Sequence, residues 1–352
     1  MRPVSINQVT PGMVVGRTIY SGDGRVLLKN GVALKRHYID RLIEMGIDLL
    51  YVLDERFPDV YVEDVVHQET RIAALTTVSQ LMSSARSGKA LSSLEVRRVV
   101  EEIVSEVVRN PASLIQLTEI RALNDYTFGH CVSVSVLSLV AGVHLRLPRP
   151  DLLVLGTGAM LHDIGKMMIP SSFLINKEGA LSPVEFHAVK QHTTYGYEVL
   201  SKVKELPDEV GLIALNHHER IDGSGYPQGL VGDEMGLLSQ ITTVCDVYDA
   251  LTTKRPYRGR YLPHEAVAML AKGRGTQYKE EAVDALLSHI AVYPVGTSVV
   301  LNNGVVGLVT EVSKNAPGRP IIRVTEEGDG WSDGDIIDLQ KHRELGVVKA
   351  HW

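Results

Sequence analysis

The stretch Ala159-Met160-Leu161-His162-Asp163-Ile164-Gly165-Lys166 decides how the middle of this chain folds. From Leu152 to Leu161, apolar residues recur at helical spacing, and Gly165 is a typical helix-ending residue. We therefore expect His162 and Asp163 in the last turn of an apolar helix. Because neighbouring helical residues point about 100° apart, their side chains can share one metal ion only beyond the helix end.

The pairing of an imidazole with a carboxylate indicates a particular kind of metal site. These ligand types together suit manganese, iron or zinc, and a carboxylate can bridge two cations. A single His-Asp pair is, however, more often a polar pair at the end of a helix. The metal-site hypothesis therefore depends on further ligand residues elsewhere in the chain.

The composition is that of an ordinary globular protein. The chain has 352 residues, of which 44% are apolar and 22% charged, enough for two or three domains. The net charge of −6 and the lack of a Lys/Arg run predict no direct binding of nucleic acid. Both cysteines, Cys131 and Cys245, lie in apolar helical patterns, so the sequence indicates no disulfide framework.

Neither the N-terminus nor the apolar stretches predict a membrane segment. Residues Met1 to Asn7 lack the apolar core of a signal peptide. The stretch Val132 to Val143 is too short and too rich in serine to span a bilayer. We therefore expect a cytoplasmic protein.

The two ends of the chain read as β-rich modules. Residues 1–60 predict a small α+β module, with a helix at Leu34 to Met45 and strands at Val14-Val15 and Arg25 to Leu28 flanking an Asp-Gly turn. Residues 292–352 contain four β-like runs separated by turn dipeptides, which predict a small β-barrel-like tail.

The region between these modules is helical. Residues 61–122 predict a helical linker and the start of a bundle, and residues 123–291 continue it as the catalytic domain. The apolar stripe of the first helices is typical of a core or of a partner-helix interface, so a homodimer through residues 62–107 stays an open alternative. The predicted fold class is mainly α, an all-helical catalytic bundle with an α+β and an all-β accessory module.

Metal-ligand residue types are concentrated in this helical middle. Each has a plain explanation by itself: an isolated histidine is usually a satisfied core residue, and the pair His217-His218 could interact with a helix dipole. Together they are hard to satisfy, because a carboxylate such as Asp246 in an apolar helix is costly unless paired or bound to a cation. The candidate metal ligands are His130, His162, Asp163, His192, His217, His218 and Asp246.

Two of these segments together carry a family resemblance. His162-Asp163-Ile164-Gly165-Lys166, followed by His217-His218-Glu219-Arg220-Ile221-Asp222-Gly223-Ser224-Gly225-Tyr226-Pro227, resembles the HD-GYP family, a bacterial branch of the HD-domain phosphohydrolases. The resemblance runs from about Asp125 to Ala291, roughly half of the chain, and includes Asp246 to Thr252 and Arg255-Pro256-Tyr257-Arg258. The terminal modules look like accessory segments.

The resemblance implies an HD-type helical bundle that holds two or three cations, usually iron or manganese. It also implies hydrolysis of cyclic di-GMP to linear pGpG, with further cleavage to GMP left open. One implied metal set is His130, His162, Asp163 and Asp246. The other is Asp163, His192 and His217, with Asp163 bridging the two ions and His218 beside them.

The resemblance also implies roles for substrate-binding residues. Lys166 matches the family lysine that contacts the scissile phosphate, and Arg255 and Arg258 match the arginine pair that binds substrate. Tyr226 would flank the phosphate or stack on a base. The loop Gly225-Tyr226-Pro227 is also the expected contact for cyclase-domain partners.

Tyr126 bears on the number of metals. It precedes His130 by one helical turn, at a position where some family members have a glutamate that helps to hold a third metal. A neutral phenol is a poor ligand for manganese or iron, so we expect two divalent ions.

Three functional hypotheses follow from the sequence. The first is a cyclic di-GMP phosphodiesterase, and the second is a hydrolase of another cyclic dinucleotide such as cyclic GMP-AMP. The third is a receptor that binds cyclic di-GMP without cleaving it. Degenerate relatives usually lose ligands, and all the expected ligands and Lys166 occur here, which favours an enzyme.

Overall fold

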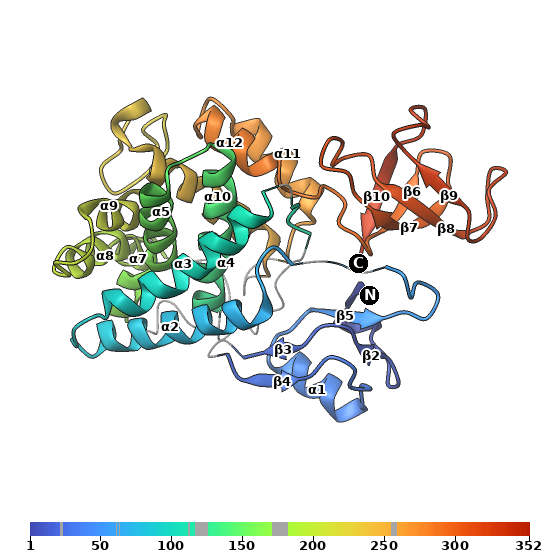
Figure 1. Cartoon of the computed structure of the whole chain (residues 1–352), viewed down its shortest axis with the longest axis horizontal. Coiled ribbons are helices and arrows are strands. Elements are labelled where there is room, and N and C mark those ends of the chain that lie inside the picture. The colour runs from blue at the N-terminus through green and yellow to red at the C-terminus, as the bar shows by residue number, and fades with distance from the viewer. Residues whose placement is uncertain are drawn as a thin grey trace.

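The computed structural model describes residues 1–21, 24–60, 62, 64–111, 113–116, 126–170, 182–254 and 259–352. Arg255 and Arg258 therefore lie outside the described residues, as does the side chain of Tyr126. Within the described part, a helical bundle occupies one side of the molecule, and the two β-rich modules lie next to each other on the other side (Figure 1).

The bundle is built from the segments that the helical patterns indicate. A serine side chain caps α3, where Ser92 Oγ accepts a hydrogen bond from the backbone N–H of Glu95. A short 3₁₀ helix, η3, spans Ile164–Met168 directly after α5. The α-helices are α2 (Gln68–Arg86), α3 (Ser93–Arg109), α4 (Tyr126–His144), α5 (Arg149–Leu161), α7 (Pro183–Lys190), α8 (His192–Leu200), α9 (Asp208–Asn216), α10 (Leu237–Thr252), α11 (Pro263–Gly273) and α12 (Glu280–Leu287).

Helix α4 contributes to two apolar cores. Its residues Val136 and Leu139 pack with α2, α3 and α5, whereas Val134 and Leu137 pack with α10 and α12. Of the described helices, it is the one long and apolar enough to cross a membrane, but 78% of that window is buried inside the protein. Its apolar character is therefore explained by packing on several sides.

The apolar stripes of α2 and α3 face the bundle itself. Val78 and Met82 of α2 and Val100 and Val104 of α3 are fully buried in the core that includes α4 and α5. Helices α2 and α3 therefore pack as part of the bundle. Because these side chains are already covered within one chain, the stripe does not require a second copy.

The N-terminal module differs in one detail from the expected strand pairing. Strands β1 (Arg2–Ser5), β5 (Leu49–Leu53) and β2 (Val14–Val15) form an antiparallel sheet in the order β1-β5-β2, and α1 spans Arg36–Glu44. The strand that pairs with β4 (Val26–Leu28) is β3 (Ile19–Tyr20), not Val14-Val15. Val14-Val15 instead pairs with β5, a strand more than 30 residues later, and local turn residues do not predict such a pairing.

The tail is a five-stranded antiparallel sheet in the order β10-β6-β7-β8-β9. Its last strand pairs with the first and was not predicted, because Val347–His351 is mostly exposed and has no apolar alternation. The all-β prediction for the tail is confirmed. The strands are β6 (Ser298–Leu301), β7 (Val306–Glu311), β8 (Ile321–Glu326), β9 (Ile336–Asp338) and β10 (Val347–His351).

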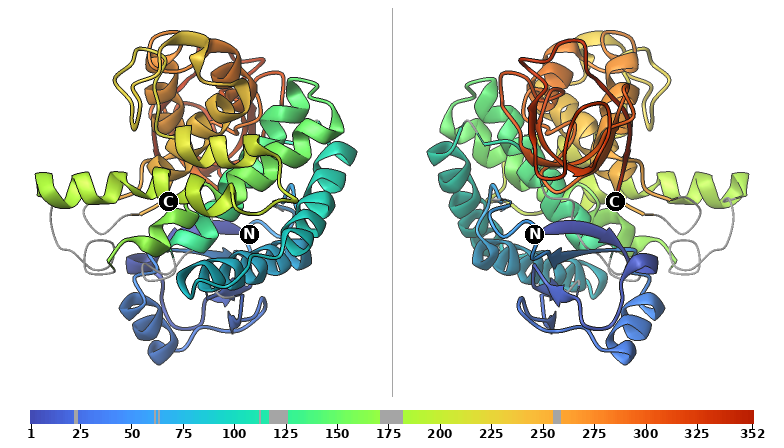
Figure 2. Two further views of the ribbon diagram at one scale, coloured as in Figure 1. Left: turned by 90° about the vertical axis from the view of Figure 1, so that its left-hand side faces the viewer. Right: turned by 90° about the vertical axis from the view of Figure 1, so that its right-hand side faces the viewer.

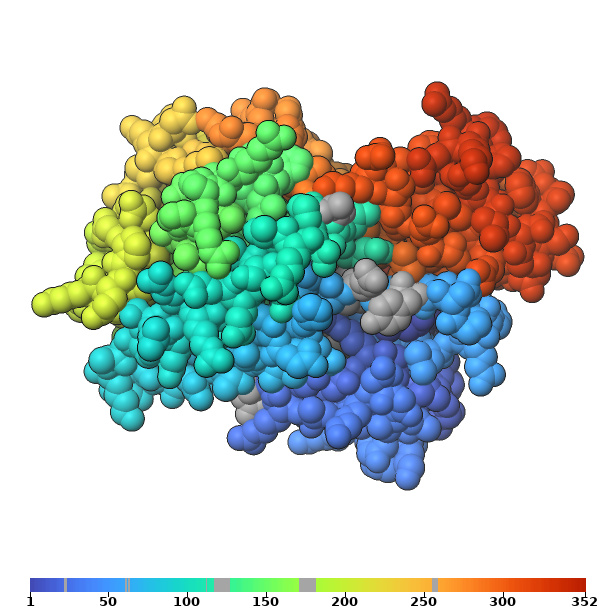
Figure 3. Space-filling view, viewed as in Figure 1, coloured from blue at the N-terminus to red at the C-terminus, as the bar shows by residue number. Residues whose placement is uncertain are grey.

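The terminal modules pack on each other and on the bundle, as the space-filling view also shows (Figure 3). Arg260 of the bundle forms a bidentate ion pair with Asp48 of the N-terminal module and lies 5.8 Å from the ring of Trp352. Asp64 joins Arg17 of the same module to Arg71 of α2. Three residues after the N-terminal sheet enter the core of the tail: Phe57, Val60 and Val62.

Candidate metal centre

The ends of several helices converge where the candidate ligands lie. His162 is the residue at which α5 ends, His192 begins α8, and His217 ends α9. Two further ligands come from within helices, His130 from the second turn of α4 and Asp246 from the middle of α10. All the candidates are buried except His218, whose side chain is 22% exposed.

Two clusters of ligand atoms form there. In one, His130, His162 and Asp163 each offer a ligand atom, and these atoms lie within 4.8 Å of one another. Asp246 joins this side, since its Oδ1 lies 3.0 Å from Nε2 of His130. The other cluster is His192, His217 and His218, and the Nε2 atoms of the first two are 3.2 Å apart.

The carboxylate of Asp163 lies between the two clusters. Its Oδ2 is 3.8 Å from Nε2 of His130 and 3.5 Å from Nε2 of His162. Its Oδ1 is 3.4 Å from Nε2 of His192 and 3.8 Å from Nε2 of His217. One oxygen thus faces each cluster, which is the geometry a bridging carboxylate needs.

Three of the histidines have the same orientation. The Nδ1 atoms of His162, His192 and His217 lie 2.7, 2.6 and 2.8 Å from backbone carbonyl oxygens, to which they can donate. That hydrogen bond places the proton on Nδ1 and leaves the Nε2 lone pair directed into the centre, as metal-binding histidines require. The acceptors belong to Ala159, Val189 and Ala214.

Burial keeps several of these imidazoles neutral. It lowers the pKa of His192 to about 4 and that of His217 well below its usual value. For Asp163, burial alone would raise the pKa, but the nearby positive charge of Lys166 is the largest cause that holds it well below the usual range. Neutral imidazoles and an ionised carboxylate are the protonation states that bind metal.

Two buried polar atoms show that the cluster is suited to cations. Nε2 of His162 and Oδ1 of Asp163 have no hydrogen-bond partner among the described residues. A buried polar atom without a partner costs about 1–3 kcal/mol. A divalent ion would satisfy both atoms, so the residues present fit a metal centre.

Two residues that follow Asp163 also contact this centre: Lys166 pairs with Asp163, and Gly165 lies against the backbone of His192. Nζ of Lys166 lies 2.5 Å from Oδ2 of Asp163, and the lysine side chain is 21% exposed. A Cβ on Gly165 would lie 1.9 Å from the carbonyl oxygen of His192. Gly165 is therefore needed for the close approach of α8 as well as for the helix end predicted from sequence.

The loop after His218 is held by a residue that the sequence analysis did not assign. Glu219 is fully buried, and its carboxylate accepts hydrogen bonds from three successive backbone N–H groups at 2.6, 3.1 and 3.1 Å. Those donors are Gln228, Gly229 and Leu230. The sequence signal that could have identified Glu219 is its position directly after the candidate ligands His217 and His218.

Tyr226 of this loop stacks on His218, with ring centroids 4.8 Å apart and an angle of 29° between the planes. The peptide bond between Tyr226 and Pro227 is cis. A Cβ on Gly225 would lie 2.4 Å from the backbone N of Arg220, so the loop can fold back this closely only with glycine there.

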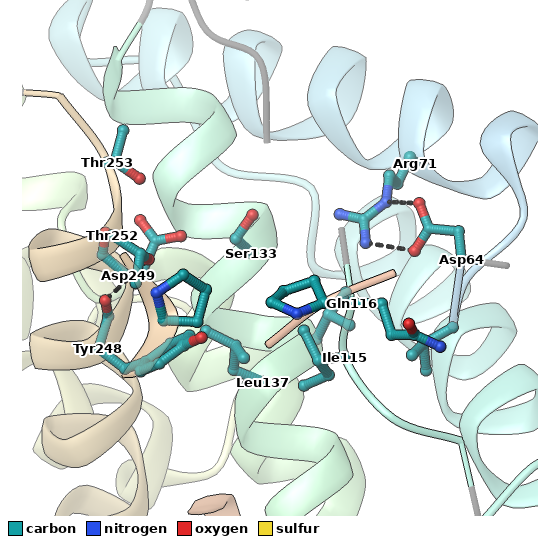
Figure 4. Close-up of a pocket in the computed structure, with 14 residues that line it drawn as sticks. Asp64, Arg71, Ile115, Gln116, Ser133, Leu137, Tyr248, Asp249, Thr252 and Thr253 are labelled. Carbon is teal, nitrogen blue, oxygen red and sulfur yellow. Dashed lines mark hydrogen bonds and ion pairs between the residues drawn. The ribbon is translucent and has the colours of Figure 1, made fainter. Parts of the chain in front are cut away.

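A pocket lies next to the centre, between α4, α10 and the segment before α2 (Figure 4). It reaches Asp249, whose Oδ2 is 2.7 Å from Nδ1 of His130. On the opposite wall, Asp64 and Arg71 form their ion pair (Figure 4). Among the lining residues that the structure describes, Asp249 is the one that contacts a candidate ligand, His130.

Family models match two parts of the chain. The HD domain model matches residues 85–282, and a model of the KOW domain associated with the HD domain matches residues 298–351. The first match covers the whole set of candidate ligands, and the second corresponds to the β tail.

Curated relatives agree with these matches. The chain is 35% identical over 265 residues to cyclic di-GMP phosphodiesterase PA4108 of Pseudomonas aeruginosa, covering 74% of this chain and 64% of that protein. It is 36% identical over 233 residues to the cyclic di-GMP phosphodiesterase response regulator RpfG of Xanthomonas campestris, covering 65% of this chain and 61% of that protein.

A further relative is named for another substrate. The chain is 34% identical over 173 residues to 3'3'-cGAMP-specific phosphodiesterase 3 of Vibrio cholerae, covering 49% of this chain and 37% of that protein. The chain thus spans less than two thirds of the length of each of these relatives. With its paired His/Asp clusters and its Gly-Tyr-Pro loop, this chain belongs to the HD-GYP branch of the HD domain phosphohydrolases.

Proposed function

We propose that the protein hydrolyses one phosphodiester bond of cyclic di-GMP and releases linear pGpG. The observation that carries the proposal is the carboxylate of Asp163, which lies between two clusters of buried metal-ligand residues with Lys166 at its side. The names of the relatives PA4108 and RpfG support this choice of substrate.

The two ion sites are assigned from the atoms that face each other. His130, His162, Asp163 and Asp246 would hold one ion, and Asp163, His192 and His217 the other, with His218 close enough to take part. Iron or manganese suits this mixture of imidazole and carboxylate. The ions would supply positive charge for the phosphate oxygens and make a water molecule nucleophilic at neutral pH.

In the reaction, the water oxygen forms a bond to phosphorus while the bond from phosphorus to the ribose 3′ oxygen breaks. The 3′ oxygen takes a proton, and the 5′ phosphate stays on the linear product. Lys166, partly exposed beside Asp163, would donate to a non-bridging phosphate oxygen and stabilise its growing charge. Arg255 and Arg258 would bind the second phosphate or a guanine edge.

One alternative substrate has specific support. Two Vibrio cholerae relatives named for 3'3'-cGAMP are each 34% identical to this chain, over 173 and 171 residues. A cyclic dinucleotide that contains one guanine would meet the same metal centre. Turnover in the cytoplasm, and contact of the Gly225-Tyr226-Pro227 loop with cyclase domains, remain part of the proposal.

The test is incubation of the purified protein with Mn²⁺ or Fe²⁺ and cyclic di-GMP or cyclic GMP-AMP, followed by chromatography. We expect pGpG to accumulate from cyclic di-GMP, and none to form with Asp163→Ala. Tight binding of cyclic di-GMP without any product would instead identify a receptor.

A further inference from the structure

A row of ring and cation contacts runs outward from the metal centre. It starts at His218, on which the ring of Tyr226 stacks. Nζ of Lys190 lies 4.7 Å from the centroid of Tyr226 and also 4.7 Å from the centroid of Phe186. Both distances are within the range of a cation–π interaction, so the two rings hold the ammonium group between them.

The helix that carries this cation projects from the bundle. Helix α7 has no fully buried residue, and Figure 2 shows it extending away from the other helices. Phe186 is 49% exposed, and Lys190, the last residue of the helix, is half-buried. An apolar ring kept at the surface beside the centre is open to contact with a flat ligand.

The position of Lys190 is tied to that of a metal ligand. Helix α8 begins at His192, two residues later, and the Thr193 hydroxyl donates to the carbonyl oxygen of Lys190 at 3.0 Å. The start of α7 is fixed too, by a capping box between Ser182 and Glu185. The ammonium group is therefore held in a defined place relative to the metal centre.

The N–H groups of Lys190 are available to a ligand. An ammonium group has three donors, and aromatic rings offer it no oxygen acceptor. Among the residues that the structure describes, no carboxylate forms an ion pair with Nζ. A ligand that presents paired acceptors next to a flat ring would satisfy both the cation and the rings.

We propose that Phe186, Lys190 and Tyr226 form a binding site for one guanine base of the substrate, in which Lys190 determines base specificity. Guanine presents its O6 and N7 acceptors along one edge, which lysine can contact together. Adenine has an amino donor in place of O6, so it meets the ammonium group with repulsion on that side. The exposed ring of Phe186 supplies stacking that accepts either base, while Tyr226, stacked on His218, holds the ammonium group in place.

This inference rests on the proposed function and narrows its substrate class. Cyclic dinucleotides with at least one guanine, whether cyclic di-GMP or cyclic GMP-AMP, would be preferred over cyclic di-AMP. The phosphates are common to all three compounds. A comparison between cyclic di-GMP and cyclic di-AMP therefore separates recognition of the base from recognition of phosphate.

The experiment compares the full-length protein with three variants, using Mn²⁺ and both dinucleotides. Lys190→Met removes the charge at nearly constant length, Lys190→Arg keeps donors for guanine, and Lys272→Met makes the same change at an exposed lysine of α11. For Lys190→Met we expect the KM for cyclic di-GMP to rise about tenfold with kcat nearly unchanged. Its KM for cyclic di-AMP should fall, because the repulsion between the ammonium group and the adenine amino group is removed.

Lys190→Arg should keep the preference for guanine, and Lys272→Met should behave as the unaltered protein. An equal rise of both KM values in Lys190→Met would show a phosphate contact and overturn the inference, and so would no change in either. Dissociation constants from calorimetry give a readout that needs no turnover. Binding without hydrolysis would refute only the proposed function, whereas failure to bind cyclic di-GMP would refute both.

Discussion

Oδ2 of Asp249 lies 2.7 Å from Nδ1 of His130, while Oδ1 of Asp246 lies 3.0 Å from Nε2 of the same ring. The two carboxylates come from α10, one helical turn apart, and contact opposite nitrogens of the imidazole. Asp249 can therefore hold the proton on Nδ1, which would leave the Nε2 lone pair to bind a metal ion together with Asp246.

This relationship predicts different results for two aspartate variants. Asp163→Ala should abolish turnover and reduce bound metal at both positions, because its oxygens face both clusters. Asp249→Ala should weaken metal binding by about 10- to 100-fold at the His130 side and leave the other ion in place. Elemental analysis after dialysis and turnover assays measure both effects. Full metal content and activity in Asp163→Ala would refute the bridging assignment.

Lys166 should affect chemistry more than binding. Its contact with the phosphate strengthens as charge develops, so Lys166→Ala should lower kcat and leave KM almost unchanged. Steady-state kinetics with cyclic di-GMP measure this, with the exposed Lys202→Ala as a matched control. A Lys166 variant altered only in KM would contradict the assigned role.

Glu219 should act through the Gly-Tyr-Pro loop. In the unaltered protein, three backbone N–H groups donate to the Glu219 carboxylate. In Glu219→Gln, one carboxylate oxygen is replaced by an N–H₂ donor, which leaves at least one backbone N–H without an acceptor. This should cost the folded loop about 1–3 kcal/mol. We expect a higher KM with metal content unchanged, since Glu219 holds the loop and not the ions. Glu198→Gln, at an exposed position of α8, is the matched control. Loss of metal from Glu219→Gln would show that the carboxylate belongs to the centre.

The number of bound metals depends on the position one turn before His130. Tyr126 begins α4, and a neutral phenol does not replace a carboxylate as a ligand. We expect two equivalents of metal per chain after anaerobic purification, measured by elemental analysis. Tyr126→Glu should raise the count toward three, and three equivalents in the unaltered protein would contradict the prediction.

The ion pairs of Asp64 should stabilise the packing of the N-terminal module on the bundle. Its oxygens lie 2.7 Å from Arg17 and 2.8 Å from Arg71, with side-chain exposures of 14% to 20%. Asp64→Asn should lower the free energy of unfolding at pH 7 by about 2–3 kcal/mol, measured by urea denaturation. Asp40→Asn, in an exposed pair, should cost about 0.5 kcal/mol or less.

The same ion pairs predict a pH dependence. Burial alone would raise the pKa of Asp64, but the charges of Arg71 and Arg17 outweigh it and lower the pKa. A lowered pKa in the folded state gives stability that is present above the unfolded value of about 3.9 and lost as the pH falls through the folded value. The difference between the unaltered protein and Asp64→Asn should therefore shrink only below about pH 4. A constant difference down to lower pH would refute this origin.

Sequence by itself determined the helical segments of the bundle and the types of ligand. Helical periodicity and turn residues are local, so the helix at Leu152 to Leu161 could be predicted without knowledge of its neighbours. The motif residues also identified which histidines and aspartates to expect at the centre. It could not predict β10, because an exposed edge strand depends on its partner β6.

Only the tertiary structure decided which of these residues meet. His130 and Asp249 are 119 positions apart, and their contact depends on how α4 packs against α10. The contact of Gly165 with His192 and the three amides that bind Glu219 also join separate segments. Local patterns predict which secondary structure each segment can form. The partners of a buried polar group are set by the packing of distant segments, because only there does its loss of water have to be compensated.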